Sequence, residues 1–275
     1  AMVGRLPFEL TAGQAEVLDV ISAGLASARP MNRMLQGEVG SGKTIISVLA
    51  MLQMVDAGYQ CALLAPTEVL AAQHARSVRQ VLGPLAMAGQ LGGAEDGTRV
   101  ALLTGSMTPQ QKRQVRDEVA CGAAGIVVGT HALLQDAVEF HNLGMVVVDE
   151  QHRFGVEQRD ALRAKARAGL TPHLLVMTAT PIPRTVALTV YGDLETSTLR
   201  ELPRGRQPIA TNTIFVTQKP AWLDRAWARI REEVGDGRQA YVVAPRIDES
   251  DKDNGEGGPP VTVLELFDRL AAGPL

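Results

Sequence analysis

The chain has 275 residues, of which 45% are hydrophobic, 21% charged and 4% aromatic, and its formal net charge at pH 7 is −3. This composition is enough to bury a core and excludes a disordered tail, and the length exceeds one average domain. The slight acidity excludes a globally basic nucleic-acid binder, and the few aromatics argue against a broad base-stacking platform. A local cationic groove that binds nucleic acid remains compatible with this charge and this aromatic content.

Short apolar runs alternate with stretches of helical length along the chain. The runs predict strands at 34–36, 61–65, 100–104, 125–129, 145–149 and 174–178. They are rich in Val, Leu and Ile without alternating polar residues, which is typical of strands buried on both faces of a parallel sheet. The alternation of strand and helix predicts an α/β fold with a parallel sheet flanked by helices.

The stretches between the runs have recognisable helix ends. They predict helices at 43–56, from Thr67 onward, at 108–122 and at 157–168. Thr108 and Gln111 are spaced as a capping box, with Pro109 at the first helical position. His74 falls on the inner face of the helix that Thr67 begins, as do the apolar residues of that helix.

A domain boundary is expected at about residue 206, because two prolines and a glycine between 202 and 208 interrupt any helix. Residues 1–205 then form one domain and residues 206–275 the beginning of another. The second part predicts strand, helix, strand and a glycine-rich loop, at 209–216, 221–234, 240–244 and 248–260. Trp222 lies on the predicted inner face of that helix. So short a segment is an incomplete α/β domain.

A phosphate-binding pattern connects the first predicted strand to the helix at 43–56. Residues 37–44 match G-x-x-x-x-G-K-[ST], whose backbone N–H groups wrap around phosphates at the positive end of a helix dipole. In such loops the lysine, here Lys43, reaches the β- and γ-phosphates, and the hydroxyl of Thr44 ligates Mg²⁺. The pattern predicts an ATP site made by Gly37, Glu38, Val39, Gly40, Ser41, Gly42, Lys43 and Thr44.

Two acids follow the predicted strand at 145–149. Asp149 is expected to hold Mg²⁺ together with Thr44, and Glu150 to polarise the attacking water. An Asp-Glu pair alone is usually a solvated turn, but a phosphate-binding loop needs such an acid at a neighbouring strand end. The predicted catalytic residues are therefore Lys43, Asp149 and Glu150.

Other side chains exclude further classes of site. Two cysteines, Cys61 and Cys121, are too few for a disulfide framework or a four-cysteine zinc site, and their apolar surroundings predict buried free thiols. His74, His141 and His173 lack metal-like spacing and are expected to be core or surface filler. Since no apolar run reaches about 18 residues and no signal-like segment opens the chain, we expect no membrane partner and a cytoplasmic location.

The tetrapeptide 149–152, Asp-Glu-Gln-His, resembles the DExH box of superfamily-two helicases, and other stretches follow the order of that family. Similar to its elements are 65–70 (motif Ia), 104–106 and 129–134 (strand-end loops), 178–181 (motif III), and Phe8 with Thr11 and Gln14 (the adenine-reading Q element). The resemblance implies a RecA-like P-loop NTPase lobe that uses ATP and Mg²⁺.

The same resemblance assigns roles to single residues. It implies that Phe8 and Gln14 bind adenine, and that Gln151, His152, Thr178 and Thr180 couple the nucleotide state to strand movement. DNA would cross the strand-end loops and be contacted through its phosphates, without reading of base sequence. The implied DNA contacts are Thr67, Thr104, Gly105, Ser106 and Thr130.

Three longer stretches, 149–156, 177–185 and 201–206, resemble one branch of the superfamily, the RecG family of DNA helicases. The resemblance covers nearly the whole chain. It implies a monomeric, ATP-driven motor that remodels forked or branched DNA and stalled replication forks in recombination and repair. The related transcription-repair coupling translocases share part of these stretches, but they typically have Glu where Gln151 stands.

The chain departs from the RecG pattern at both ends. A wedge domain that engages the fork does not precede the motor, and motifs V and VI do not follow the segment at 241–246, which resembles motif IV. We therefore expect a fragment with one full motor lobe and the truncated start of a second, which hydrolyses little ATP by itself because the arginine fingers lie elsewhere.

Three alternatives remain open from the residues. A P-loop ATPase that never binds nucleic acid is one, although a transporter ATPase would carry an LSGGQ-like signature, which is missing. An interaction module with an inactive nucleotide site is disfavoured because Lys43, Thr44, Asp149 and Glu150 are intact. The third is the coupling translocase.

Overall fold

The structure is a computed structural model that describes residues 8–89, 93–94, 97–135, 137–149, 165, 171–180, 194–201, 210–244 and 262–272. The chain divides into two compact units, Ala1–Arg206 and Gln207–Leu275. The predicted helix at 157–168, apart from Lys165, and the predicted loop at 248–260 lie outside the described residues.

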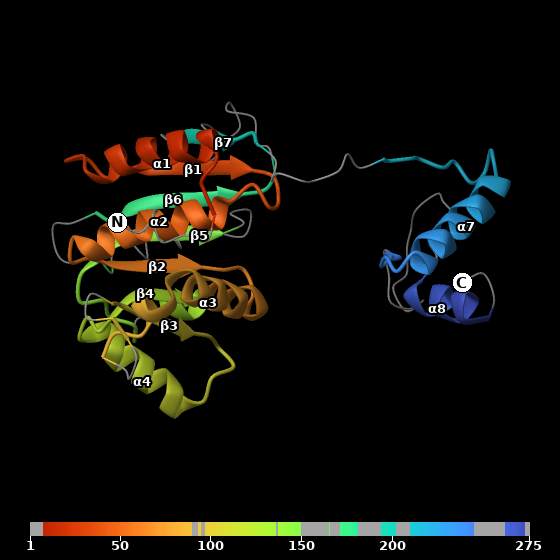
Figure 1. Cartoon of the computed structure of the whole chain (residues 1–275). Helices are drawn as coiled ribbons and strands as arrows, with labels where there is room; N and C mark the ends of the chain where they lie inside the picture. The colour runs from red at the N-terminus through yellow and green to blue at the C-terminus, as the bar shows by residue number, and fades with distance from the viewer. Residues whose placement is uncertain are drawn as a thin grey trace. The chain divides into compact units, whose positions relative to one another are not determined.

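The first unit is built on a seven-stranded sheet with the order β3-β4-β2-β5-β6-β1-β7. All of its strand pairs are parallel, so the carboxyl ends of the strands share one edge (Figure 1). The strands are β1 (Asn32–Gly37), β2 (Gln60–Leu64), β3 (Arg99–Leu103), β4 (Ala124–Gly129), β5 (Leu143–Asp149), β6 (His173–Thr178) and β7 (Glu195–Leu199). The predicted parallel α/β sheet is confirmed, and the six predicted strands match β1 to β6 within two residues.

The described residues of this unit form four α-helices, which cover the two faces of the sheet. They are α1 (Ala12–Leu25), α2 (Lys43–Asp56), α3 (Glu68–Leu82) and α4 (Pro109–Ala120), with short 3₁₀ helices η2 (Gly83–Ala86) and η3 (His131–Leu134). Alternate residues of each central strand enter different cores: Cys61 and Leu63 pack with α1, α2 and α3, while Ala62 and Leu64 pack with α4 and η3. Figure 1 shows α1, α2 and α3 on one face. The capping box of Thr108 and Gln111 is present at the start of α4, as predicted.

The edge strand β7 was not among the predicted strands, and its composition explains why. Its sequence, Glu-Thr-Ser-Thr-Leu, is polar and half-exposed, as an edge strand allows. It pairs with β1, where the buried Arg33 forms an ion pair with Glu195 and donates from Nη1 to the Ser197 hydroxyl at 2.9 Å. The polar contacts of Arg33 thus help to pair β1 with β7, a strand that has no apolar run.

The described part of the second unit contains two helices, α7 (Ala221–Gly235) and α8 (Val263–Ala272). The predicted helix is confirmed as α7, but its buried residue is Trp227, whereas Trp222 is exposed below the ammonium of Lys219. The strands predicted at 209–216 and 240–244 are wrong for residues 210–216 and 240–244, which form none. A strand needs a hydrogen-bonded neighbour, and the described residues of this unit offer none to these segments.

The cysteines behave differently from one another. Cys61 is a buried free thiol, as predicted. Cys121 is also a free thiol, but its predicted burial is wrong, because this residue caps the end of α4 and is exposed. No helix among the described residues has the length and apolar character that crossing a membrane requires.

Candidate functional site

The predicted phosphate loop joins β1 to α2 at the carboxyl edge of the sheet. Gly40 and Gly42 have φ of 85° and 94°, which favour glycine. Gly42 is doubly constrained, since a Cβ there would lie 2.3 Å from Nε2 of Gln14. The loop therefore needs glycine both for its backbone conformation and for the close approach of α1.

Lys43 lies within the loop that precedes it. Its Nζ donates to the carbonyl oxygens of Gly37 at 2.6 Å and Glu38 at 2.9 Å, which keeps the ammonium on the inner side of the loop. Ser41 is a buried member of the loop, and its Oγ has no hydrogen-bond partner among the described residues. A Cβ at Gly37 would come within 2.5 Å of that oxygen. The loop thus combines the ammonium of Lys43, a backbone that bends tightly at Gly40 and Gly42, and the buried hydroxyl of Ser41. These features fit the binding of phosphate.

Asp149 ends β5, two strands away from the loop. β6 lies between β5 and β1, with Asp149 opposite Met177 and Gln36 opposite Thr178. Asp149, the Thr178 strand end and the predicted phosphate loop therefore come from three adjacent strands and meet at one edge. Glu150, Gln151 and His152 lie outside the described residues.

The carboxylate of Asp149 contacts a residue that the sequence did not single out for function. Nε2 of His74, on α3, lies 2.6 Å from Oδ2 of Asp149, and the two side chains are 12% and 14% exposed. His74 was expected to be core or surface filler on the inner face of this helix, and the structure adds a partner, Asp149, that this expectation did not include. Pairing with Asp149 depends on the order of the strands, which the spacing of residues does not reveal.

The residues of this edge fit Mg²⁺. The carboxylate of Asp149 and the hydroxyl of Thr44 are oxygen ligands of the kind that a hard cation prefers. No group of three or more His, Cys, Asp and Glu side chains that could hold a metal occurs in the described residues. Few protein ligands are typical of Mg²⁺, which keeps its waters and binds phosphate oxygens of the nucleotide.

Thr178 and Thr180 form a tight turn after β6. Their hydroxyl oxygens are 3.0 Å apart, and the backbone N–H of Thr180 donates to Oγ1 of Thr178 at 3.2 Å. Nε2 of Gln36, the residue before the phosphate loop, donates to the carbonyl of Thr180 at 3.2 Å. The turn is thus bonded to the strand that carries the loop.

Gln14 is brought to the phosphate loop by the first turn of α1. Thr11 and Gln14 form a capping box, in which Oε1 of Gln14 accepts from the N–H of Thr11 at 3.0 Å. Nε2 of Gln14 donates to the carbonyl of Ser41 at 2.9 Å. Phe8, the other predicted adenine contact, is 49% exposed.

The predicted DNA contacts lie on the other half of the same edge. Thr104 follows β3, Thr130 follows β4 and Thr67 follows β2, and these three strands are neighbours. Thr67 caps α3, its Oγ1 accepting from the N–H of Leu70 at 3.3 Å. The carboxyl edge is thereby divided into a nucleotide half at β5-β6-β1, which carries the predicted nucleotide site, and a DNA half at β3-β4-β2, which carries the predicted DNA contacts. Of these contacts, Thr104 is buried.

A carboxylate occupies part of the second half. Oε1 of Glu68, the first residue of α3, accepts from the N–H of Ser106 at 3.0 Å. Hydrogen bonds from the Ser106 side chain, then from the N–H groups of Ser106 and Gly105, together with the nearby charge of Lys112, hold the pKa of Glu68 below its ordinary value. Lys112 also donates to the carbonyl of Gly105 at 2.5 Å. The contact between Glu68 and Ser106 joins the loop of residues 104–106 to the start of α3.

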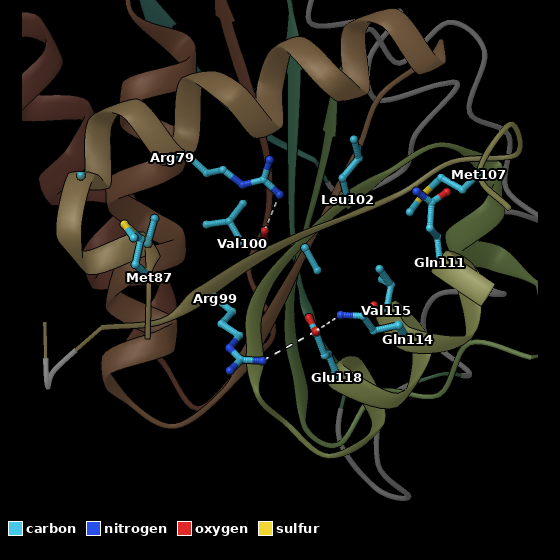
Figure 2. A pocket seen from close by; sticks show the side chains of 13 residues that line it. Arg79, Met87, Arg99, Val100, Leu102, Met107, Gln111, Gln114, Val115 and Glu118 are labelled. Atoms are coloured by element: carbon cyan, nitrogen blue, oxygen red, sulfur yellow. Dashed lines mark hydrogen bonds and ion pairs between the residues drawn. The ribbon is translucent and has the colours of Figure 1, made fainter. Parts of the chain in front are cut away.

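A separate cavity of about 690 Å³ lies beside the edge strand β3, between α3 and α4. Figure 2 shows that Arg79 reaches the carbonyl of Val100, at 2.7 Å, and that Arg99 and Glu118 face each other across the opening, at 3.6 Å. None of the predicted site residues lines it. This cavity is therefore distinct from the nucleotide half of the edge.

The sequence and structure were compared with known proteins. Residues 11–189 match the family model of the DEAD/DEAH box helicases. The chain is 79% identical over 276 residues to the ATP-dependent DNA helicase RecG of Mycobacterium tuberculosis, and 48% identical over 252 residues to that of Aquifex aeolicus. These matches cover 100% and 92% of this chain but 37% and 30% of the relatives, so the chain spans about a third of their length.

Solved structures agree with these relatives. A RecG bound to a three-way DNA junction superposes with a TM-score of 0.71 at 37% identity, over 88% of this chain and 30% of that one. The DEAD-box helicase Mss116 bound to single-stranded RNA superposes with a TM-score of 0.56 at 17% identity, over 84% of this chain and 50% of that one. The second likeness concerns the fold alone.

Proposed function

Because the chain belongs to the DEAD/DEAH box helicase family, we propose that it is the nucleotide-binding motor lobe of a RecG-type, ATP-dependent DNA helicase. In this proposal the protein that contains the chain uses ATP hydrolysis to remodel forked or branched DNA and stalled replication forks during recombination and repair. The motor acts as a monomer in the cytoplasm. Its DNA contacts are to the backbone and do not depend on base sequence.

One observation carries the proposal. A phosphate loop, a strand-end acid and a row of strand-end hydroxyls lie on one edge of a single parallel sheet, in a chain that is 79% identical along its whole length to a protein named RecG. Ligands of open parallel sheets bind outside the carboxyl ends of the strands. Both halves of the edge are therefore suited to binding, and their separation allows two ligands at once.

The nucleotide half supplies the chemistry of hydrolysis. Lys43 neutralises charge on the β- and γ-phosphates, while the N–H groups of Gly40 to Thr44 hold them in place. Thr44 and Asp149 hold Mg²⁺, which when bound neutralises the charge that develops on the phosphate oxygens. Glu150 orients and polarises the attacking water, and Phe8 with Gln14 binds the adenine side of ATP.

Coupling and DNA binding involve the remaining predicted residues. Gln151, His152, Thr178 and Thr180 transmit the nucleotide state to the second lobe, a role supported by the bond between the Thr180 carbonyl and Gln36. DNA phosphates bind the strand-end residues Thr67, Thr104, Gly105, Ser106 and Thr130. In this proposal residues 206–275 begin the second RecA-like lobe, and a wedge domain belongs to the full-length protein.

The experiment measures ATP hydrolysis by the full-length protein that contains this chain, without DNA, with linear duplex and with a model fork. We expect the fork to stimulate hydrolysis most and the fork to be unwound. Equal rates under all three conditions would favour an ATPase that does not act on nucleic acid. Equal stimulation by linear duplex and fork would favour a duplex translocase instead. The Lys43→Ala variant controls for contaminating ATPases.

A further inference from the structure

The contact between His74 and Asp149 has no assigned role, and we propose that His74 is a positioning residue that orients the carboxylate of Asp149 toward Mg²⁺. This inference rests on the proposed function, since that function makes Asp149 a metal ligand. His74 itself touches neither nucleotide nor metal in this proposal. It acts through the aspartate.

The geometry of the pair supports positioning. An ionised carboxylate only accepts hydrogen bonds, so Nε2 of His74 is the donor to Oδ2 of Asp149 at 2.6 Å. Of the hydrogen bonds recorded between described residues, this is the only one to the Asp149 carboxylate. One oxygen is thereby fixed by the imidazole, and the other remains available at the edge of the sheet. Such an arrangement selects one rotamer of the acid.

Anchoring α3 to the sheet is a weaker explanation of the contact. The helix already packs through Ala71, Ala75, Val78 and Leu82, all of which are buried in the core. Its first turn is capped by Thr67. Apolar burial and a cap account for the position of the helix. The contact of His74 is therefore not needed to hold the helix and can orient Asp149 instead.

The pair also connects the two halves of the carboxyl edge. Glu68 and His74 belong to the same helix and are six positions apart, which corresponds to about 9 Å along its axis. Glu68 is bonded to Ser106 in the DNA half, and His74 to Asp149 in the nucleotide half. A shift of the loop at 104–106 that moves α3 would therefore reach the metal acid through His74.

The test measures how Mg²⁺ affects the binding of a fluorescent ADP derivative to the 275-residue chain. Outer-shell partners of metal ligands typically change metal affinity about 10–100-fold when they are replaced. We expect His74→Ala to raise the half-saturating Mg²⁺ concentration by a factor in that range. Nucleotide affinity in the presence of EDTA should equal that of the unsubstituted chain.

A matched pair of amides makes the test independent of folding defects. The amide nitrogen of Gln lies near the place of the imidazole Nε2, whereas that of Asn falls one methylene short. His74→Gln should retain most of the Mg²⁺ response, and His74→Asn should behave as His74→Ala does. Gln73→Ala, at an exposed residue of the same helix, should match the unsubstituted chain.

The results separate this inference from the function on which it rests. An unchanged Mg²⁺ response in His74→Ala, equal responses of the Gln and Asn variants, or an equal loss of affinity with and without Mg²⁺ would each overturn the positioning role. Failure of the unsubstituted chain to bind nucleotide, or binding that ignores Mg²⁺, would instead refute the proposed site itself.

Discussion

The amide of Gln14 donates to the carbonyl of Ser41 at 2.9 Å, a bond between residues 27 positions apart that ties α1 to the phosphate loop. The same side chain accepts from the N–H of Thr11. One residue therefore both begins the helix and supports the loop. Its two functions can be separated by substitution, because only the amide nitrogen contacts the loop.

Replacing Gln14 by Glu should weaken nucleotide binding without disturbing the start of α1. A carboxylate can still accept from Thr11 in the capping box, but it cannot donate to Ser41. A lost hydrogen bond is worth about 0.5–1.5 kcal/mol, which predicts about two- to tenfold weaker binding of ADP. Calorimetric titration measures it, with Gln53→Glu on α2 as a control. Unchanged affinity would mean that the bond does not support the loop.

Replacing Lys43 by Ala should prevent productive ATP binding. The ammonium lies against the carbonyls of Gly37 and Glu38, on the inner side of the loop, and its hydrogen bonds to phosphate would be charge-assisted. Such bonds contribute about 1.5–3 kcal/mol, so affinity should fall by at least about tenfold. Titration against Lys219→Ala, which removes an exposed charge just before α7, provides the comparison. Equal affinities would exclude Lys43 from phosphate binding.

Replacing Thr178 or Thr180 by Ala should reduce unwinding per ATP in the full-length protein while basal hydrolysis is largely kept. Their hydroxyls contact each other within the turn, and the carbonyl of Thr180 accepts a hydrogen bond from Gln36. The turn follows β6, the neighbour of the strand that ends in Asp149. Parallel ATPase and fork-unwinding assays measure the ratio. Thr178→Ser retains the hydroxyl and should restore coupling. An equal fall in both activities would indicate a structural role alone.

Replacing Glu68 by Gln should tighten DNA binding at low salt. The carboxylate accepts from the N–H of Ser106, a predicted phosphate contact, and its charge repels phosphate. We expect about a several-fold gain that disappears at high salt, because added ions screen the charge. Fluorescence anisotropy with forked DNA measures it. Weaker binding would show that Glu68 instead holds the loop in its binding conformation.

The same contact predicts a response to acid. Because the pKa of Glu68 is lowered in the folded protein, the contact stabilises the loop above the ordinary pKa of the group and is lost as the pH falls through the lowered value. Stability of the unsubstituted chain should therefore decline more steeply in acid than that of Glu68→Gln, as thermal unfolding across that range would measure.

The two thiols should differ in reactivity. Cys121 is exposed, whereas Cys61 is buried and burial raises the pKa of its thiol. A thiol reagent at neutral pH should modify one cysteine per folded chain quickly and the second only in denaturant, because the thiolate is the reactive form. Cys121→Ser should abolish the fast phase. A fast phase that persists in this variant would contradict the burial of Cys61.

The central fold could be predicted because its strands are signalled locally. β2, β4 and β5 are continuous apolar runs, and a strand covered on both faces requires no more than that. β7 carries no such run, and its pairing depends on Arg33, a residue 162 positions away from Glu195. The strands predicted after residue 206 illustrate the reverse case, since local apolar character does not supply a partner strand.

The candidate site likewise contains features that the sequence predicts locally and one contact that it does not predict. The phosphate loop and the capping box of α4 are contiguous patterns whose geometry depends on a few neighbouring residues, so the sequence alone predicts them. His74 and Asp149 are 75 positions apart and meet only because β5 lies beside β2, the strand that precedes α3 in the chain. Spacing along the chain contains no information about that meeting.

The place of β1 in the sheet has a consequence for how the protein is made. β1 is the first of the seven strands of this sheet to be synthesised, yet its two neighbours, β6 and β7, are the last of them. The strand that carries the phosphate loop therefore has no partner until β6, which ends at Thr178, has been synthesised, and it gains its second partner only with β7, which ends at Leu199. This lobe can thus complete its nucleotide site only late in the synthesis of the sheet. Contacts of such long sequence separation slow folding, and a chain interrupted before β7 would keep an open sheet edge that invites aggregation.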